Sequence, residues 1–341
     1  MIGDWLVAIA LPPLITVGTI AWLRQSRWSD RLADHPNERS LHAWPVPRVG
    51  GLGIMAGALP VAFFFASAQG KAILGCAVVL MCISLADDLR SRSIGLRLSA
   101  HAFAAAVAIL VIVPPLPALG AFAWLAITAA WAAILWMTNL FNFMDGSDGL
   151  AGGMSTIGFA TLATAAAGAG QTALALESAA LAAASAGFLL RNFPPATVFM
   201  GDAGSIPLGF LAAALGLHGV QLGAWPPWFP VLVFSPFIAD ATVTILRRLA
   251  SGERIWIAHR QHAYQRLVLA GWSRRRLAVI AYVFMSAAAA SAMAGLGEGA
   301  LVRCGIISVW IALYALLYAA IERHAASPAA TIVPPTTKER R

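Results

Sequence analysis

Long apolar runs constrain this chain more than any other feature of its sequence. Its 341 residues are 60% hydrophobic and only 11% charged, whereas soluble proteins are about a quarter charged. The charge is confined to short patches between apolar runs of about 17–22 residues, the length that a helix needs to cross ~30 Å of hydrocarbon. The sequence therefore predicts an all-α, polytopic integral membrane helical bundle.

We expect about eleven transmembrane helices. They lie near 3–23, 51–69, 72–86, 98–113, 121–138, 150–168, 172–190, 204–221, 229–246, 277–296 and 302–321. No long polar stretch separates them, so residues 1–324 are expected to form a single transmembrane domain. The Pro- and Thr-rich end, 325–341, is expected to be a disordered cytoplasmic tail.

The positions of the cations predict the orientation. All but two of the 23 lysines and arginines, Lys71 and Arg303, lie in one alternating set of loops. By the positive-inside rule these loops are cytoplasmic, and an odd number of spans then puts the N-terminus outside and the C-terminus inside. Contact of these loops with anionic lipid explains the net charge of +8, so we do not expect nucleic acid as a partner.

The remaining polar residues gather on the same side. Of the 15 Asp and Glu, only Asp4, Glu177 and Glu298 lie near the other face. A transporter needs polar groups near the middle of the membrane, where Glu177 and Asp240 are sparse candidates. The distribution favours an enzyme that joins a water-soluble substrate to a lipid one, with a sugar-nucleotide or lipid-phosphate transporter as the alternative.

The most informative stretch is 139–153, which reads N-L-F-N-F-M-D-G-S-D-G-L-A-G-G. Asn142, Asp145 and Asp148 recur every three residues, so a helical turn would place them on one side. Carboxylates near a bilayer are costly and usually functional, and the glycines let backbone amides approach a ligand closely. The stretch predicts a polar site for a phosphate-containing ligand; a solvated loop with turn glycines is the alternative.

Two further acidic patches suit a metal ion. Asp87 and Asp88 end the third span, and adjacent carboxylates repel each other unless a cation lies nearby, which suits Mg²⁺ binding or proton abstraction. A solvated helix end before Arg90 and Arg92 is the alternative. Asp202 opens the eighth span within F-M-G-D-A-G-S, where its carboxylate suits Mg²⁺ and the helix N-terminus suits a phosphate; an N-cap is the alternative.

Two cationic loops carry further candidates. Arg48 offers a planar fork for phosphate oxygens, and Gly50 and Gly51 could offer backbone amides to an anion; a basic loop that merely retains topology is the alternative. His259 and His262 are three residues apart, so a helix would put them on one side. Two such groups could hold a diphosphate, whereas zinc is disfavoured because no Cys or third His is close.

Taken in order, the strings at 34–53, 87–88, 139–153, 199–205 and 259–262 resemble those of the polyprenyl-phosphate N-acetylhexosamine-1-phosphate transferases of glycosyltransferase family 4. The resemblance implies a multi-pass enzyme of the bacterial inner membrane whose active site faces the cytoplasm. It would transfer N-acetylhexosamine 1-phosphate from a UDP-N-acetylhexosamine to undecaprenyl phosphate and release UMP. It also implies Mg²⁺ as the cofactor, with Mn²⁺ as an alternative, and leaves a homodimer open.

The resemblance also implies a role for each candidate residue. Asp202 matches the metal ligand, with Asn142 close to it, and Asp87 matches a carboxylate proposed as base or nucleophile, with Asp88 beside it. The other matches are Asn142, Asp145 and Asp148 around metal and nucleotide, Asn192 and Phe199 at uracil, Arg48 on the substrate, and His259 and His262 near the diphosphate. A one-step transfer and a two-step route through phosphorylated Asp87 both remain open.

Two departures from the family pattern restrict the choice of donor sugar. The branch that uses UDP-MurNAc-pentapeptide has three consecutive histidines, whereas this chain has His259-x-x-His262. The branch that makes the GlcNAc-lipid of common antigen and teichoic acid often has a third Asp after the pair, which is absent here. The string H-R-Q-H-A-Y-Q-R is most similar to O-antigen-initiating members. We therefore expect O-antigen initiation, with the peptidoglycan reaction as the alternative.

Overall fold

The computed structural model describes residues 2–34, 45–89, 93–113, 123–254, 257 and 259–325. These residues are mostly helical, which confirms the predicted all-α polytopic membrane fold. The central part of the first loop, 35–44, and the end of the chain from 326 onwards lie outside the described residues, so the expectations for both segments stay predictions.

Fourteen helices and one strand pair lie within the described residues. The helices are α1 (Ile2–Gln25), α2 (Trp28–Arg31), α3 (Gly50–Phe65), α4 (Ala68–Leu89), α5 (Ile94–Ile112), α6 (Ala123–Phe143), α7 (Leu150–Gly168), α8 (Thr172–Asn192), α9 (Asp202–Gln221), α10 (Trp228–Val233), α11 (Ser235–Ala250), α12 (Ala263–Leu269), α13 (Arg274–Gly295) and α14 (Ala300–Ala325). The strands β1 (Ala33–Asp34) and β2 (Val46–Pro47) pair antiparallel, with Asp34 opposite Val46.

Nine helices in the described ranges are long and apolar enough to cross a membrane. The other two predicted spans are shorter: α3 has 16 residues, and the expected helix over 229–246 is wrong as one element, because α10 and α11 meet at Phe234. Pro236 explains the break, since proline lacks an N–H and its ring clashes with the carbonyl four residues earlier. The total of eleven spans stays a prediction.

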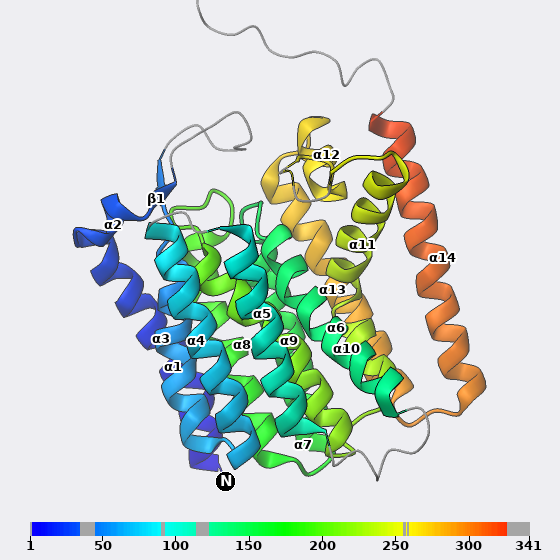
Figure 1. The fold of residues 1–341 in the computed structure, drawn as a ribbon, viewed down its shortest axis with the longest axis horizontal. Helices are drawn as coiled ribbons and strands as arrows, with labels where there is room; N and C mark the ends of the chain where they lie inside the picture. Colours follow the sequence, from blue (N-terminus) through cyan, green and yellow to red (C-terminus); the bar gives the residue numbers. More distant parts are fainter. Residues whose placement is uncertain are drawn as a thin grey trace, which may run out of the picture.

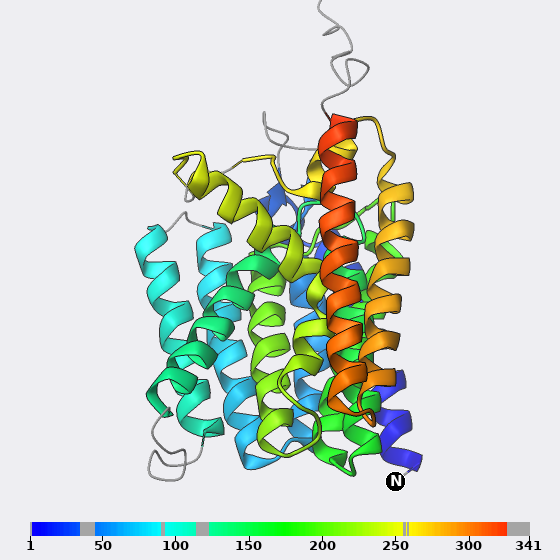
Figure 2. The ribbon, with the colours of Figure 1, turned by 90° about the vertical axis from the view of Figure 1, so that its right-hand side faces the viewer.

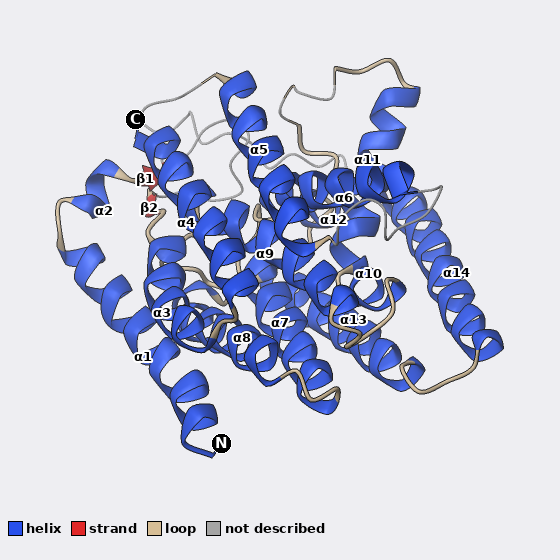
Figure 3. Ribbon diagram, turned by 60° about the horizontal axis from the view of Figure 1, so that its bottom comes forward, coloured by secondary structure: helices blue, strands red, loops and turns tan. Residues whose placement is uncertain are grey.

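The helices α7, α8 and α9 lie in the middle of the bundle, whereas α1, α5 and α14 lie at its periphery (Figure 3). Within the apolar part of α9, 83% of the residues are buried, against 11% for α14. A helix that faces lipid can be apolar on all sides, as Leu301 and Leu316 of α14 illustrate with 88% and 69% exposure. The inner helices therefore provide the rigid frame on which the polar loops are mounted.

Loops that alternate along the chain come together at one end of the bundle. Figures 1 and 2 show α2, β1 and α12 at the end opposite the N-terminus. Because the long helices alternate in direction, the loops 144–149 and 193–201 also reach this end. This arrangement confirms that the polar patches share one end. The side of the membrane that this end faces stays a prediction.

Candidate active site

Arg97 links the ends of two helices that carry acidic residues. Its Nη1 lies 2.9 Å from Asp87 Oδ2, in the last turn of α4, and 3.5 Å from Asp202 Oδ2, at the start of α9. Two carboxylates 115 residues apart in sequence are thus held by one nitrogen. The shared cation offsets the repulsion between them.

Asp202 is also positioned by the backbone and by α6. Gly201, the residue before it, has a positive φ of 74°, a conformation that favours glycine. The Nδ2 of Asn142 donates to Asp202 Oδ1 at 2.8 Å and to Ser205 Oγ at 3.0 Å. Asn142 therefore fixes the orientation of the Asp202 carboxylate at the N-terminus of α9, where an anion is favoured.

Arg48 joins the first loop to this group. It forms a close ion pair with Asp34 and lies 3.7 Å from Asp88 Oδ1. Burial alone would lower the pKa of Arg48, but the carboxylates of Asp34, Asp88 and Asp202 outweigh it and raise the pKa. The other oxygen of Asp88, Oδ2, is buried and has no hydrogen-bond partner among the described residues.

Asp145 belongs to the same electrostatic group. It is half-buried in the loop after α6. Removal from water and then the charge of Asp202 raise its pKa well above the usual range, with a smaller effect of Asp88, although Arg48 and a backbone hydrogen bond from Gly201 oppose the shift. We call Asp87, Asp88, Asp145 and Asp202 the carboxylate cluster.

Asp148 and Asn192 make other contacts. Asp148 accepts from the backbone N–H of Ala196 at 3.0 Å and pairs with Arg274 at 3.2 Å. Asn192 accepts from Gly149 N–H and donates to Val198 O, both at 2.9 Å. These contacts join the loops that carry Asp145 and Phe199. The expected helical turn through Asp148 is wrong, because α6 ends at Phe143, and substrate contacts by Asp148 and Asn192 stay predictions.

The loop that carries Phe199 is fastened to the start of α3. The N–H groups of Gly50 and Gly51 donate to Phe199 O at 2.9 Å and Met200 O at 2.8 Å. The expectation that these two amides bind an anion is therefore wrong. A Cβ on Gly51 would lie 2.4 Å from Gly204, so glycine is needed there because the backbones of α3 and α9 touch.

The two histidines precede α12 and are not in a helix, contrary to the expected i, i+3 geometry. The centroids of their rings are nevertheless 4.9 Å apart. The backbone N–H of Gln261 donates to His259 Nδ1 at 3.3 Å. Burial and then the neighbouring His262 lower the pKa of His259 to about 4, so at neutral pH His259 is uncharged, with its one ring proton on Nε2.

A cavity of about 620 Å³ is lined by both histidines and by side chains that contact the carboxylate cluster. Its polar lining comes from Arg97, Asn139, Asn142, His259, His262 and Gln265. Arg97 and Asn142 both contact Asp202. The remaining lining is apolar and comes from α5, α6 and α11, with Leu98, Trp136 and Ile245 among its residues. The cavity therefore offers both charged groups and hydrocarbon surface.

The comparisons with known proteins agree with these motifs. The model of glycosyl transferase family 4 matches residues 71–220. A probable undecaprenyl-phosphate N-acetylglucosaminyl 1-phosphate transferase of Bacillus subtilis (strain 168) is 30% identical over 268 residues, covering 73% of each chain. The chain belongs to glycosyl transferase family 4. It is a membrane-embedded sugar-phosphate transferase, as the resemblance of its motifs predicts.

Two further members of glycosyl transferase family 4 match over longer segments. Undecaprenyl-phosphate alpha-N-acetylglucosaminyl 1-phosphate transferases of Yersinia pestis and Escherichia coli (strain K12) are 31% and 32% identical to this chain. The matches cover 84% and 76% of this chain, and 82% and 74% of those proteins.

Sequence reasoning missed two residues of this family 4 transferase. In the sequence Arg97 is one of the cations that predict the orientation, and its position beside the start of a span, soon after Asp87, is the available signal for a partner. Asp240 is one of the acids expected near the cytoplasmic side and a candidate for a transporter path, with no role in a transferase. An acid within an apolar run was the available signal, but its partner His262 lies 22 residues away.

Proposed function

We propose that this protein transfers N-acetylhexosamine 1-phosphate from a UDP-linked donor to undecaprenyl phosphate, and so initiates O-antigen synthesis. The products are UMP and an undecaprenyl-diphosphate sugar. The names of the three relatives support undecaprenyl phosphate as the acceptor and N-acetylglucosamine 1-phosphate as the transferred group. The reaction takes place at the cytoplasmic face of the bacterial inner membrane, which the positive-inside rule supports.

The observation that carries this proposal is the cavity whose lining joins polar and apolar side chains. Its polar lining has a cation, Arg97, and a neutral donor, His259, suited to phosphate oxygens. Its apolar wall suits an isoprenoid chain that enters from the bilayer. A cavity for two water-soluble substrates would not need such a wall.

The residues present fit Mg²⁺. Within the described ranges, no three His, Cys, Asp or Glu side chains form a complete ligand set, but Mg²⁺ is usually bound through one or two carboxylates together with substrate phosphates. Asp88 Oδ2 is buried without a partner and lies beside Gly201, the residue before Asp202. Asp202 would hold the ion, with Asp88 and Asn142 next to it. Bound Mg²⁺ would neutralise the charge that develops on the phosphates.

The side chains of the site divide the remaining work. Asp87, held by Arg97 at 2.9 Å, keeps the acceptor phosphate deprotonated. An oxygen of that phosphate attacks the phosphorus that carries the sugar. The bond from this phosphorus to the bridging oxygen breaks, and UMP leaves with that oxygen. His259 and His262 hold the diphosphate, and His259 does so as a neutral donor through Nε2.

A donor panel tests the proposal. Purified protein in lipid nanodiscs is given undecaprenyl phosphate, Mg²⁺ and radiolabelled UDP-GlcNAc, UDP-GalNAc, a UDP-6-deoxy-HexNAc or UDP-MurNAc-pentapeptide. We expect UMP and a labelled lipid from one of the first three donors, and neither product without undecaprenyl phosphate. Turnover of UDP-MurNAc-pentapeptide alone would assign the peptidoglycan reaction instead, and no UMP from any donor would overturn the proposed function.

A further inference from the structure

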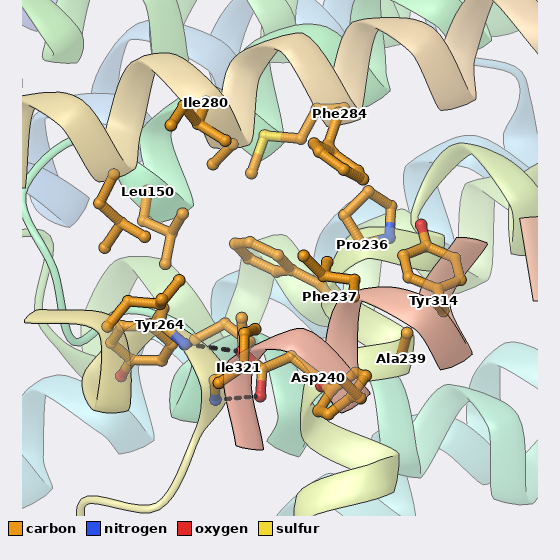
Figure 4. Close-up of a pocket in the computed structure, with 18 of the residues that line it drawn as sticks. Leu150, Pro236, Phe237, Ala239, Asp240, Tyr264, Ile280, Phe284, Tyr314 and Ile321 are labelled. Carbon is orange, nitrogen blue, oxygen red and sulfur yellow. Dashed lines mark hydrogen bonds between the residues drawn. The ribbon is translucent and has the colours of Figure 1, made fainter. Parts of the chain in front are cut away.

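Asp240 lies outside the carboxylate cluster, on α11, and is only 7% exposed. Its carboxylate accepts hydrogen bonds from backbone N–H groups at the start of α12 (Figure 4). Oδ1 accepts from the N–H of Ala263 at 2.9 Å, and Oδ2 accepts from the N–H of Tyr264 at 3.2 Å. The first N–H groups of a helix have no partner within the helix, and an anion is favoured there. Asp240 therefore fastens the start of α12 to α11.

The same carboxylate contacts a histidine of the cavity. His262 Nδ1 lies 3.3 Å from Asp240 Oδ1. An ionised carboxylate can only accept a hydrogen bond, so this contact favours the ring form in which Nδ1 carries a proton. His259 has the opposite arrangement, because Gln261 N–H donates to its Nδ1. Nδ1 thus faces a carboxylate in His262 and a backbone N–H in His259.

Asp240 and His262 also lie between two cavities. His262 lines the cavity of about 620 Å³ that adjoins the carboxylate cluster. Asp240 lines a second, apolar cavity of about 540 Å³ among α11, α13 and α14, together with Phe237, Phe284 and Tyr314 (Figure 4). The contact between the carboxylate and the imidazole is thus part of the wall between them. Because Asp240 is packed in this wall, it can hold the ring of His262 in one orientation.

We propose that Asp240 is a positioning residue that fixes the orientation of His262, with Nδ1 protonated toward Asp240 and Nε2 facing the substrate. This inference rests on the proposed function, in which His262 contacts the diphosphate. A carboxylate that orients a metal-bound imidazole contributes about 10–100-fold in metal affinity or activity, and we expect a loss of the same order here. The structural alternative is that Asp240 only holds α12 in place.

A double-mutant cycle separates these two roles, because residues that act through each other are non-additive. Asp240→Asn is expected to lower kcat about 10–100-fold, with KM changed by less than about threefold. In the His262→Ala background the same substitution should cost less than about threefold. Thr244→Val, which removes another hydrogen bond to Asp240 Oδ1 (3.2 Å), is the matched control and should keep kcat within about twofold.

Either of two kinetic results would overturn the inference. One is an equal loss from Asp240→Asn in both backgrounds, and the other is unchanged kcat in a folded Asp240→Asn protein. If Asp240→Asn does not fold, ¹⁵N spectra of histidine-labelled wild-type protein decide, with the His262 signal assigned from His262→Asn. We expect the Nδ1-protonated signature, and an Nε2-protonated His262 would overturn the inference. The spectrum does not depend on any donor, so it also separates this inference from a failure of the proposed function.

Discussion

Arg97→Gln is the sharpest test of the carboxylate cluster. The substitution removes the charge that lies 2.9 Å from Asp87 and 3.5 Å from Asp202, and it leaves the repulsion between these carboxylates without compensation. At an effective dielectric constant of about 20, each contact is worth roughly 5 kcal/mol. The Arg97 side chain is 33% exposed, so water screens a large part of this energy.

The expected loss of transition-state stabilisation lies between the energies measured for exposed and for buried ion pairs. Exposed pairs contribute about 0–1 kcal/mol, and breaking a buried pair costs about 3–5 kcal/mol. We therefore expect Arg97→Gln to cost about 2 kcal/mol of transition-state stabilisation, which is about a thirty-fold loss in kcat/KM. The assay is UMP release at saturating undecaprenyl phosphate, with the UDP-sugar concentration varied.

Two control variants define the result. Arg97→Lys keeps the charge and should stay within about fivefold of the wild type, because a single nitrogen, Nη1, makes both contacts. Arg303→Gln removes a cation in the first turn of α14, at the opposite end of the bundle, and should have no effect on kcat/KM. If Arg97→Gln retains wild-type kcat/KM within twofold and melts at the wild-type temperature, Arg97 does not hold the cluster and the reasoning fails.

Three further outcomes are expected. Asp202→Ala should lower UMP release by at least about a hundredfold even at saturating Mg²⁺, whereas Glu298→Ala, at the other end of the bundle, should not change it; near-native activity of Asp202→Ala would contradict the metal assignment. Gly51→Ala should lower the free energy of unfolding by about 1–3 kcal/mol, because its Cβ would lie 2.4 Å from the backbone of α9. Gly75→Ala, with no described atom within 4 Å of its Cβ, should melt at the wild-type temperature, and equal melting of both variants would refute the close approach. The pKa of His259 is lowered from 6.5 to about 4, so the unfolded chain binds this proton first as the pH falls and the wild type loses stability between pH 6.5 and 4. His259→Gln should lose less over that window, and identical slopes of melting temperature against pH would show that His259 is not held neutral by the fold.

Features that follow from local composition could be predicted from the sequence. The apolar runs predict the helices, because length and hydrophobicity suffice to identify a membrane span. The break at Phe234 was missed although Pro236 is visible in the sequence, because prolines elsewhere lie inside helices, as Pro207 does in α9. The choice between a kink and a break depends on packing around the proline, and sequence does not contain that packing.

Pairings across the chain could not be predicted. The period of three linking Asn142, Asp145 and Asp148 suggested one helical face. In the structure Asn142 donates a hydrogen bond to Asp202, whereas Asp148 forms an ion pair with Arg274. The helical period applies only while the helix continues, and α6 ends directly after Asn142. The partners are then chosen by contacts between segments more than 50 residues apart, about which local spacing says nothing.

The candidate site is built from two parts of the chain. The region matched by the family model, 71–220, contains the whole carboxylate cluster, whereas His259 and His262 come later. A seven-residue helix such as α12 has little stability of its own. Its position depends on Asp240 and on the Tyr264 hydroxyl, which donates to Phe143 O at 3.0 Å. We therefore expect changes in the histidine loop to move the proposed diphosphate contacts while the carboxylates stay in place. The sequence departs from three consecutive histidines in this loop, so we expect the loop to accommodate a different donor sugar.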